Sequence, residues 1–358
     1  PPPPPPGFFF PPDPGIRDRV ASRGLGDVYK RQLLGLSGVP FASGEGDAYP
    51  ELAFVSFQMM FAIITPALIT GAFAERFQIK TYLIFLVLWS TFVYSPITHW
   101  VWAEKGWLLE LGALDFAGGT VIHINAGIAA VAAALIVGKR RNPGLQPNNV
   151  PYVVLGAAIL WFGWFGFNAG SGLLADSTAV SAFLVTNTSA AVAGLVWMVL
   201  DYQSTGRVSA VGFATGVIAG LASITPAAGF VGPMGALAIG TIGSIAAYTT
   251  VKLMAKTSID DALEVFAVHG VGGLWGTIAT GIFATGGVGL IDGDSDLLWA
   301  NFRAAVAVVI YSGIASFIIL KILDVIPGLG LRTPEEDEDR GLDIALHGER
   351  GYVADGAD

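Results

Sequence analysis

Two histidines, His123 and His269, each lie in a stretch without charged residues that is long enough to cross a membrane. His123 lies in the uncharged run 116–138 and His269 in the run 265–291. A charged side chain within the hydrocarbon costs roughly 2.5–3.5 kcal/mol on insertion scales, so such residues usually face a pathway or a partner. Neutral imidazole both donates and accepts hydrogen bonds and titrates near neutral pH. The pair therefore indicates one site that handles protons. Two histidines are too few for a zinc site, and we expect no metal.

The composition is that of an integral membrane protein. Charged residues make up 13% and hydrophobic residues 53% of the 358 residues, whereas soluble domains carry about 25% charged residues. The chain has no cysteine, which excludes disulfides and thiolate metal sites. The net charge of −9 is concentrated in 331–358, where nine acids face three arginines. The acidity therefore describes the tail, and we expect no nucleic-acid partner.

We predict an all-α membrane protein with nine spans. A spanning helix needs about 20 apolar residues, and most of the uncharged runs match one helix each. The run 208–251 is too long for one helix and is interrupted by Pro226 and Pro233, so it predicts two. Many small residues fit close packing between helices in lipid. The runs are 52–74, 81–103, 116–138, 142–175, 177–200, 208–251, 265–291 and 304–320.

Lysines and arginines in short loops predict the orientation. Every second loop is basic, and the intervening loops are mostly acidic. We therefore expect an extracytoplasmic loop over 34–51, a transmembrane domain over 52–325 and an acidic cytoplasmic tail over 326–358. The basic loop residues are Arg76 and Lys80, then Lys139, Arg140 and Arg141, then Arg207, then Lys252 and Lys256.

Residues 1–33 differ in character from the rest of the chain. They begin with six prolines, which favour polyproline II or disorder. They lack the apolar core of about 7–15 residues that a signal peptide requires. We interpret them as a non-native leader that has replaced genuine helices. A disordered cytosolic leader is an alternative, although it conflicts with a first span that begins outside, and a fragment of another domain is a third.

The segment from Asp115 to Arg140, DFAGGTVIHINAGIAAVAAALIVGKR, resembles the signature of the ammonium transporter family (Amt/MEP/Rh). The resemblance covers about 52–347 in order. It implies eleven helices, of which the first ten form two inverted halves of five, a homotrimer with one pore per subunit, and no cofactor. The nine spans would be the family's third to eleventh. Further matching blocks are FQMMFAIITPALITGAFAER (57–76), WFGWFGFNAGS (161–171), ITPAAGF (224–230), FAVHGVGG (266–273) and GLRTPEEDEDRGLD (330–343).

The absence of two front helices leads to a further expectation. It would open one side of the pore to lipid, so we expect the chain in this form to be inactive or unstable. We also expect its genomic locus to encode the missing helices.

The resemblance implies an outer ammonium site formed by Phe61, Trp102 and Ser171. Phe61 and Phe167 would close the outer end of the pore, and Trp164 would line its wall. Aromatic faces attract a cation, and a serine oxygen accepts an N–H group. Taken alone, Trp102 also fits an interfacial belt, Ser171 a small packing residue, and a phenylalanine ordinary core.

The resemblance also places His123 and His269 in contact below the gate, one ring nitrogen donating and the other accepting. Asp115 would hold the shape of the outer site, since an acid at a helix N-terminus caps it. Thr225 lies at a break between helices, where its hydroxyl can satisfy freed backbone groups. His99, His347 and Glu264 are weaker candidates, at a helix end, in the tail and in a solvated cap.

The favoured function is transport of ammonium into the cell across the inner or plasma membrane. The species conducted would be ammonium itself or ammonia, with the proton moving separately or not at all. One alternative is an ammonium sensor that signals through its tail, and another is a neutral Rh-like gas channel. An intramembrane enzyme lacks an acid, a nucleophile or a full metal set at matching depth, so we expect no enzyme. The family's tail packs under a neighbouring subunit, near where a PII-type signal protein can bind.

Overall fold

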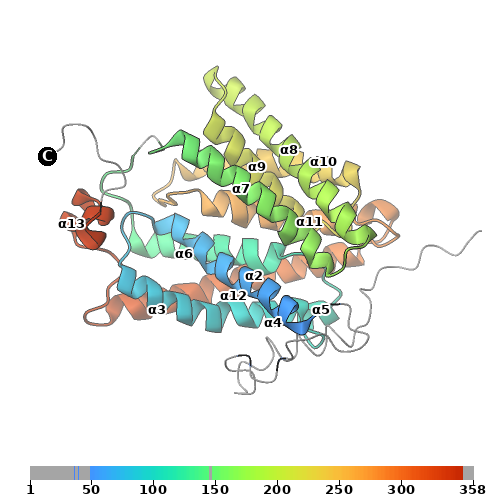
Figure 1. The fold of residues 1–358 in the computed structure, drawn as a ribbon, viewed down its shortest axis with the longest axis horizontal. Coiled ribbons are helices and arrows are strands. Elements are labelled where there is room, and N and C mark those ends of the chain that lie inside the picture. The colour runs from blue at the N-terminus through green and yellow to red at the C-terminus, as the bar shows by residue number, and fades with distance from the viewer. Residues whose placement is uncertain (1–35, 37–38, 40–48, 145–146, 350–358) are drawn as a thin grey trace, which may run out of the picture.

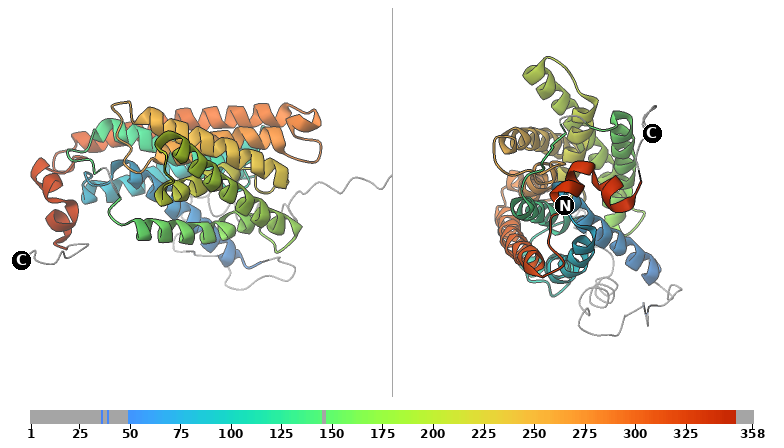
Figure 2. Two further views of the ribbon diagram at one scale, coloured as in Figure 1. Left: turned by 90° about the horizontal axis from the view of Figure 1, so that it is seen from above. Right: turned by 90° about the vertical axis from the view of Figure 1, so that its left-hand side faces the viewer.

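The computed structural model describes residues 36, 39, 49–144 and 147–349. These residues form a bundle of helices that lie mostly along its long axis (Figures 1 and 2). Within them the one β-type pairing is an isolated bridge between Phe77 and Arg332. The predicted leader 1–33 and most of the predicted loop 34–51 lie outside the described residues.

Eight segments of the described chain are long and apolar enough to cross a membrane, and α9 is a shorter apolar helix. Several of these spans contain a π-helical turn. The elements are α2 (Glu51–Phe73), α3 (Ile79–Trp89), a π-turn (Ser90–Tyr94), α4 (Ser95–Trp102), α5 (Trp107–Glu110), a π-turn (Gly119–Ile124), α6 (Asn125–Val137), α7 (Val150–Ala169), α8 (Ser177–Thr205), α9 (Ala210–Ile224), α10 (Pro233–Met254), a π-turn (Phe266–Val271), α11 (Gly272–Phe283), α12 (Asp296–Val325), α13 (Glu335–Arg340) and a final π-turn (Asp343–His347).

The prediction of two helices within 208–251 is confirmed, but α9 has only 15 residues. It ends at Ile224, just before Pro226, and the chain then turns back into the bundle. The Phe116 amide donates to the Pro226 carbonyl at 3.1 Å. The segment between α9 and α10 is therefore not helical, and it packs against the segment that contains Phe116.

Small residues let neighbouring helices approach closely. On the α8–α9 contact, a Cβ at Gly220 would lie 2.5 Å from the Ser189 carbonyl oxygen. The Ser189 hydroxyl donates to the Gly220 carbonyl at 2.8 Å. Close backbones and interhelical hydrogen bonds of this kind stabilise helix packing where lipid provides no hydrophobic drive.

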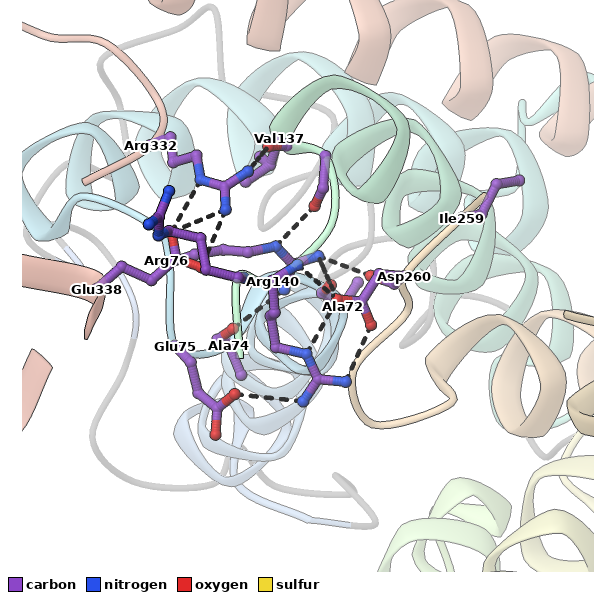
Figure 3. A network of polar contacts seen from close by, with 12 residues as sticks. Ala72, Ala74, Glu75, Arg76, Val137, Arg140, Ile259, Asp260, Arg332 and Glu338 are labelled. Atoms are coloured by element: carbon purple, nitrogen blue, oxygen red, sulfur yellow. Dashed lines mark hydrogen bonds and ion pairs between the residues drawn. The ribbon is translucent and has the colours of Figure 1, made fainter. Parts of the chain in front are cut away.

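The C-terminal segment 330–349 is attached to one end of the bundle, called the tail end. The Thr333 amide donates to the Arg76 carbonyl at 3.0 Å. The Arg332 guanidinium donates to Glu338 of α13 at 2.8 and 2.9 Å, and to the Val137 carbonyl at 3.2 Å (Figure 3). The start of the tail is thus joined to the ends of α2 and α6.

A second ion pair at the tail end joins two loops. The Arg140 guanidinium donates to the Asp260 carboxylate at 3.0 and 2.9 Å. Burial opposes ionisation of this carboxyl, but the hydrogen bonds from Arg140 and the charges of Arg140 and Arg76 outweigh burial. The pKa of Asp260 is therefore lowered.

The lowered pKa predicts how acid affects folding. A carboxyl group whose pKa is depressed in the folded state stabilises that state above its unfolded pKa, roughly 3.9. This contribution is lost as pH falls through the folded value. Below about pH 4, we expect wild type to lose more thermal stability than Asp260→Asn, measured by unfolding midpoints in detergent between pH 7 and 3. Parallel curves for the two proteins would contradict this prediction.

Candidate functional site

The two histidines meet inside the bundle, each in a π-helical turn at the start of its span. His123 lies in the turn Gly119–Ile124 and His269 in the turn Phe266–Val271. Their Nδ1 atoms are 3.2 Å apart, and both side chains are buried, at 1% and 8% exposure. Single π-turns within helices are rare and occur often at functional sites. Nothing in the sequence predicted these turns.

Glycines bring the two histidine-bearing helices together. A Cβ at Gly127 would lie 2.3 Å from the Cα of Gly270, which follows His269 directly. A Cβ at Gly273 would lie 2.8 Å from the Cβ of His123. Any larger residue at these positions would separate the backbones and with them the imidazoles.

An aspartate eight residues before each histidine caps its π-turn. Asp115 accepts hydrogen bonds from the Gly118, Gly119 and Thr120 amides at 2.6–2.7 Å and from Val121 at 3.3 Å, and it also accepts from the Thr120 hydroxyl. This carboxylate therefore holds the start of the His123 turn as its N-terminal cap.

Asp261 repeats the arrangement before His269. Its carboxylate accepts from the Phe266 amide, five residues on, at 2.7 Å. In both segments the third residue after the aspartate is left-handed, with φ of +113° at Gly118 and +60° at Glu264. The two histidine turns are thus built on one local design. Burial, together with the neighbouring Asp261 and Asp201, raises the pKa of Glu264. The prediction singled out Asp115 but missed Asp261, although the equal spacing to the histidines was visible.

Aromatic rings line the space beside His123. The Trp164 ring stacks on it at 5.4 Å between centroids and 20° between planes. The Phe167 ring lies 6.0 Å from it at 22°. The Trp164 Nε1–H donates to the Thr225 hydroxyl at 2.9 Å, and that hydroxyl donates to the Leu221 carbonyl at 2.7 Å. Thr225 thereby orients the ring that stacks on His123, a contact the sequence did not reveal.

The rings of Phe61 on α2 and Phe167 on α7 are in direct contact. Their centroids are 4.6 Å apart and their planes meet at 40°, so the rings are tilted. Phe61 is 1% exposed. Phe57, one turn earlier on α2, packs edge-on against Phe61 at 4.8 Å and was not predicted.

Trp102 and Ser171 lie beside this pair. The Trp102 ring meets Phe61 edge-on at 5.7 Å, and its Nε1–H donates to the Asp115 carbonyl at 2.8 Å. The Ser171 hydroxyl donates to the Phe167 carbonyl at 2.8 Å. Since that bond uses its only proton, the Ser171 oxygen can offer only lone pairs to a ligand. Phe61, Phe167 and Trp102 thus form one aromatic corner, and Ser171 is hydrogen-bonded to the backbone of Phe167.

The remaining histidines lie elsewhere. His99 is on α4 and His347 is in the final π-turn of the tail. Neither makes a described contact with His123 or His269.

Comparison with known proteins identifies the family. The model of the Ammonium Transporter Family matches residues 27–352. The chain belongs to this family. It is 46% identical to the ammonium transporter of Bacillus subtilis (strain 168) over 327 residues, which are 89% of this chain and 80% of that protein. Its fold matches the crystal structure of Saccharomyces cerevisiae Mep2 with a TM-score of 0.81 and 38% identity, over 88% of this chain and 74% of that one. It also matches a sensor Amt protein, with a TM-score of 0.76 and 36% identity over 83% and 77% of the two chains.

Thr225→Val tests the support of the wall in this ammonium transporter family member. Valine keeps the shape but leaves the buried Trp164 N–H without its acceptor, which costs about 1–3 kcal/mol. We expect a lower unfolding midpoint and slower ammonium flux through proteoliposomes. The matched control is Thr188→Val on α8, whose exposed hydroxyl donates only to the Leu184 carbonyl. Equal effects of the two substitutions would show that Thr225 has no special role.

Proposed function

We propose that this protein moves ammonium across a cell membrane, taking the ion in at an outer aromatic site and passing it along the histidine pair. The observation that carries the proposal is the hydrogen-bonded pair His123–His269, buried directly behind the contact between Phe61 and Phe167. The chain's membership of a transporter family supports the same conclusion.

The outer site would recruit the cation. Trp102, which is only partly buried, would attract a cation to its ring by about 0.5–2 kcal/mol, with the buried Phe61 ring beside it. Ser171 offers an oxygen whose own proton is already donated to Phe167. Ammonium makes a directional hydrogen bond to a single acceptor of this kind, whereas potassium needs several oxygen ligands, so one oxygen beside aromatic rings favours ammonium.

The two phenyl rings would strip water from the ion. Passing between them requires ammonium to lose hydration, which favours release of a proton and passage of neutral ammonia. Trp164 stacked on His123 continues the apolar wall. The proton leaves ammonium, and it either returns to the outer side or follows through the pore.

The histidine pair would give ammonia both kinds of hydrogen bond. Between two neutral imidazoles, one Nδ1 donates to the other. The donor ring then presents an accepting Nε2, and the acceptor ring presents an Nε2–H. Ammonia can donate to the first and accept from the second, and the accepting Nε2 of the donor ring can take up a proton in transit.

The orientation follows from the basic loops, which would place the tail end in the cytoplasm. The chain would then be a multi-pass protein of the inner or plasma membrane, and the tail would lie where a PII-type protein could bind. Only 6% of the residues in the most apolar stretch of the α7 span are buried. That helix therefore leaves a face open to lipid or to another copy of the chain, consistent with a homotrimer.

Proteoliposomes that contain the chain and an internal pH dye would test the function. Pulses of ammonium are expected to evoke a saturable current, and pulses of potassium none. Ammonia flux visible only as an internal pH change would identify a neutral gas channel. If monodisperse protein gave neither signal, the transport proposal would be wrong.

A sensor is the second candidate. It is favoured by the match to a sensor Amt protein and by the attachment of the tail to Arg76 at the end of α2, the helix that carries Phe61. Ammonium-dependent protection of the tail from protease, without current or pH change, would support it.

A further inference from the structure

We propose that Asp260 is a positioning residue for the histidine pair. Its carboxylate fixes the loop before the His269 turn to the end of the His123 helix and so sets the separation of the two imidazoles. The inference rests on the proposed function only for its effect on transport. The effect on the imidazoles is independent of it.

The first connection is a set of three hydrogen bonds from Arg140 to the Asp260 carboxylate. Asp260 accepts from the Arg140 backbone amide at 2.8 Å and from two nitrogens of its guanidinium at 3.0 and 2.9 Å. Arg140 follows α6, which ends at Val137 and continues directly from the π-turn that carries His123. Paired hydrogen bonds of this kind fix orientation as well as distance.

The second connection runs through Arg76, whose side chain is fully buried. Its guanidinium donates to the Gly138 carbonyl at 2.8 Å and to the Asp260 carbonyl at 2.6 Å. It also donates to the Ala72 and Ala74 carbonyls of the α2 end. Figure 3 shows Arg76 and Arg140 reaching Asp260 together, so the two chain segments are joined twice.

The loop that Asp260 fixes leads directly into the His269 turn. The next residue, Asp261, caps that turn through the Phe266 amide. The loop is also held to α2, because the Leu263 amide donates to the Gly71 carbonyl at 3.0 Å. A movement of Asp260 would therefore be passed to His269 through a short and hydrogen-bonded segment.

The two histidine-bearing helices cross at the contact of Gly127 with Gly270, so a movement at the Asp260 junction can be passed along the helix to His123. Gly127 touches Gly270, and the helix rise places Gly138 about 16 Å beyond that contact and His123 about 6 Å before it. If the crossing acts as a pivot, a 1 Å displacement at the junction moves His123 by about 0.4 Å in the other direction. The Nδ1–Nδ1 distance of 3.2 Å is already at the long end of hydrogen bonding. A shift of that size would weaken the bond.

The adjacent residue provides a matched control. Arg141 pairs with Glu335 and Asp339 of the tail helix and makes no described contact with the loop at Asp260. It has the same charge and lies in the same loop as Arg140, but it is not part of the junction. Arg141→Ala should therefore leave the histidines undisturbed.

The test combines a spectroscopic and a transport measurement on the full chain in lipid. The chain has only four histidines, so ring ¹⁵N-histidine labelling gives a simple solid-state NMR spectrum. His99→Gln and His347→Gln assign the two remaining signals. Wild type, Asp260→Asn, Arg140→Lys and Arg141→Ala are compared after each is shown to be monodisperse. Ammonium and potassium currents are recorded on the same samples.

For Asp260→Asn we expect altered Nδ1 shifts and a weaker ¹⁵N–¹⁵N coupling between His123 and His269. The ratio of ammonium to potassium current should fall about tenfold, since small misplacements in such sites cost rate steeply. Arg140→Lys, which keeps the charge but loses the paired geometry, should give a smaller change in the same direction. If Asp260→Asn does not fold, Arg140→Lys decides the question.

Unchanged histidine signals in these folded variants would overturn the proposal. Changed signals with an unchanged current ratio would uphold the positioning role and refute its effect on transport. The same signal changes in Arg141→Ala would also overturn the proposal. If wild type carried no current, the proposed function would fail, while the NMR comparison would still decide whether Asp260 positions the pair.

Discussion

The double variant His123→Ala, His269→Ala is expected to lose its preference for ammonium over potassium by about two orders of magnitude, the scale on which a positioned proton-transfer group acts. Both imidazoles are buried and share a hydrogen bond. Alanine at both sites replaces the pair by a cavity that water can enter, and a hydrated ion then no longer needs to release a proton. Currents evoked by ammonium and potassium pulses in proteoliposomes measure the change.

The single variant His99→Gln serves as the control for that experiment. His99 lies on α4, outside the contacts of the pair, and its replacement should leave the current ratio as in wild type. Unaltered selectivity in the double variant would show that the pair does not control passage, and the outer corner of Phe61, Trp102 and Ser171 would then carry the selectivity alone.

The residues alone were sufficient to predict the helical bundle and one site that uses both histidines, whereas their direct contact was expected only from the family resemblance. Long uncharged runs indicate spans because the hydrocarbon excludes charge, and a histidine within such a run usually faces a pathway or a partner. The short α9 shows the limit of that argument. Hydropathy reports where a segment is apolar, but it does not report that the chain turns back at Pro226.

Contacts between distant residues that the family resemblance does not imply could not be predicted. Arg76 and Lys80 counted equally as basic loop residues in the orientation argument, yet Arg76 is fully buried between the ends of α2, α6 and the loop at Asp260. The hydrogen bond from Trp164 to Thr225 is similar, since nothing local to either residue names the other. Such hydrogen bonds depend on how the helices pack, and helix packing cannot be predicted from the residue pattern of one sequence.

The repeated spacing from aspartate to histidine has a physical reason. In each copy the carboxylate holds the amides of a tight turn that includes a left-handed residue. Gly118 adopts that conformation without strain, whereas Glu264 does so with a Cβ and is therefore disfavoured. A strained residue in one copy and a glycine in the other indicate that the left-handed geometry of the turn is required before both histidines.

Asp115→Ala is expected to be the most destabilising of the substitutions considered. The carboxylate accepts from four backbone amides and one hydroxyl. Alanine leaves these buried donors unpaired, and each costs about 1–3 kcal/mol unless water reaches it. Five such donors sum to at least about 5 kcal/mol, a large fraction of the stability of a typical domain.

The same substitution at the second copy provides the comparison. Asp261 holds the His269 turn with fewer bonds, chiefly the one from Phe266, so Asp261→Ala should cost about half as much. Unfolding midpoints in detergent and the yield of folded protein measure both variants. Asp115→Asn, which keeps an accepting oxygen, should fall between wild type and alanine. An Asp115→Ala protein as stable as wild type would mean that water replaces the carboxylate, and the turn at His123 would then owe its shape to the contact of Gly119 with Pro226.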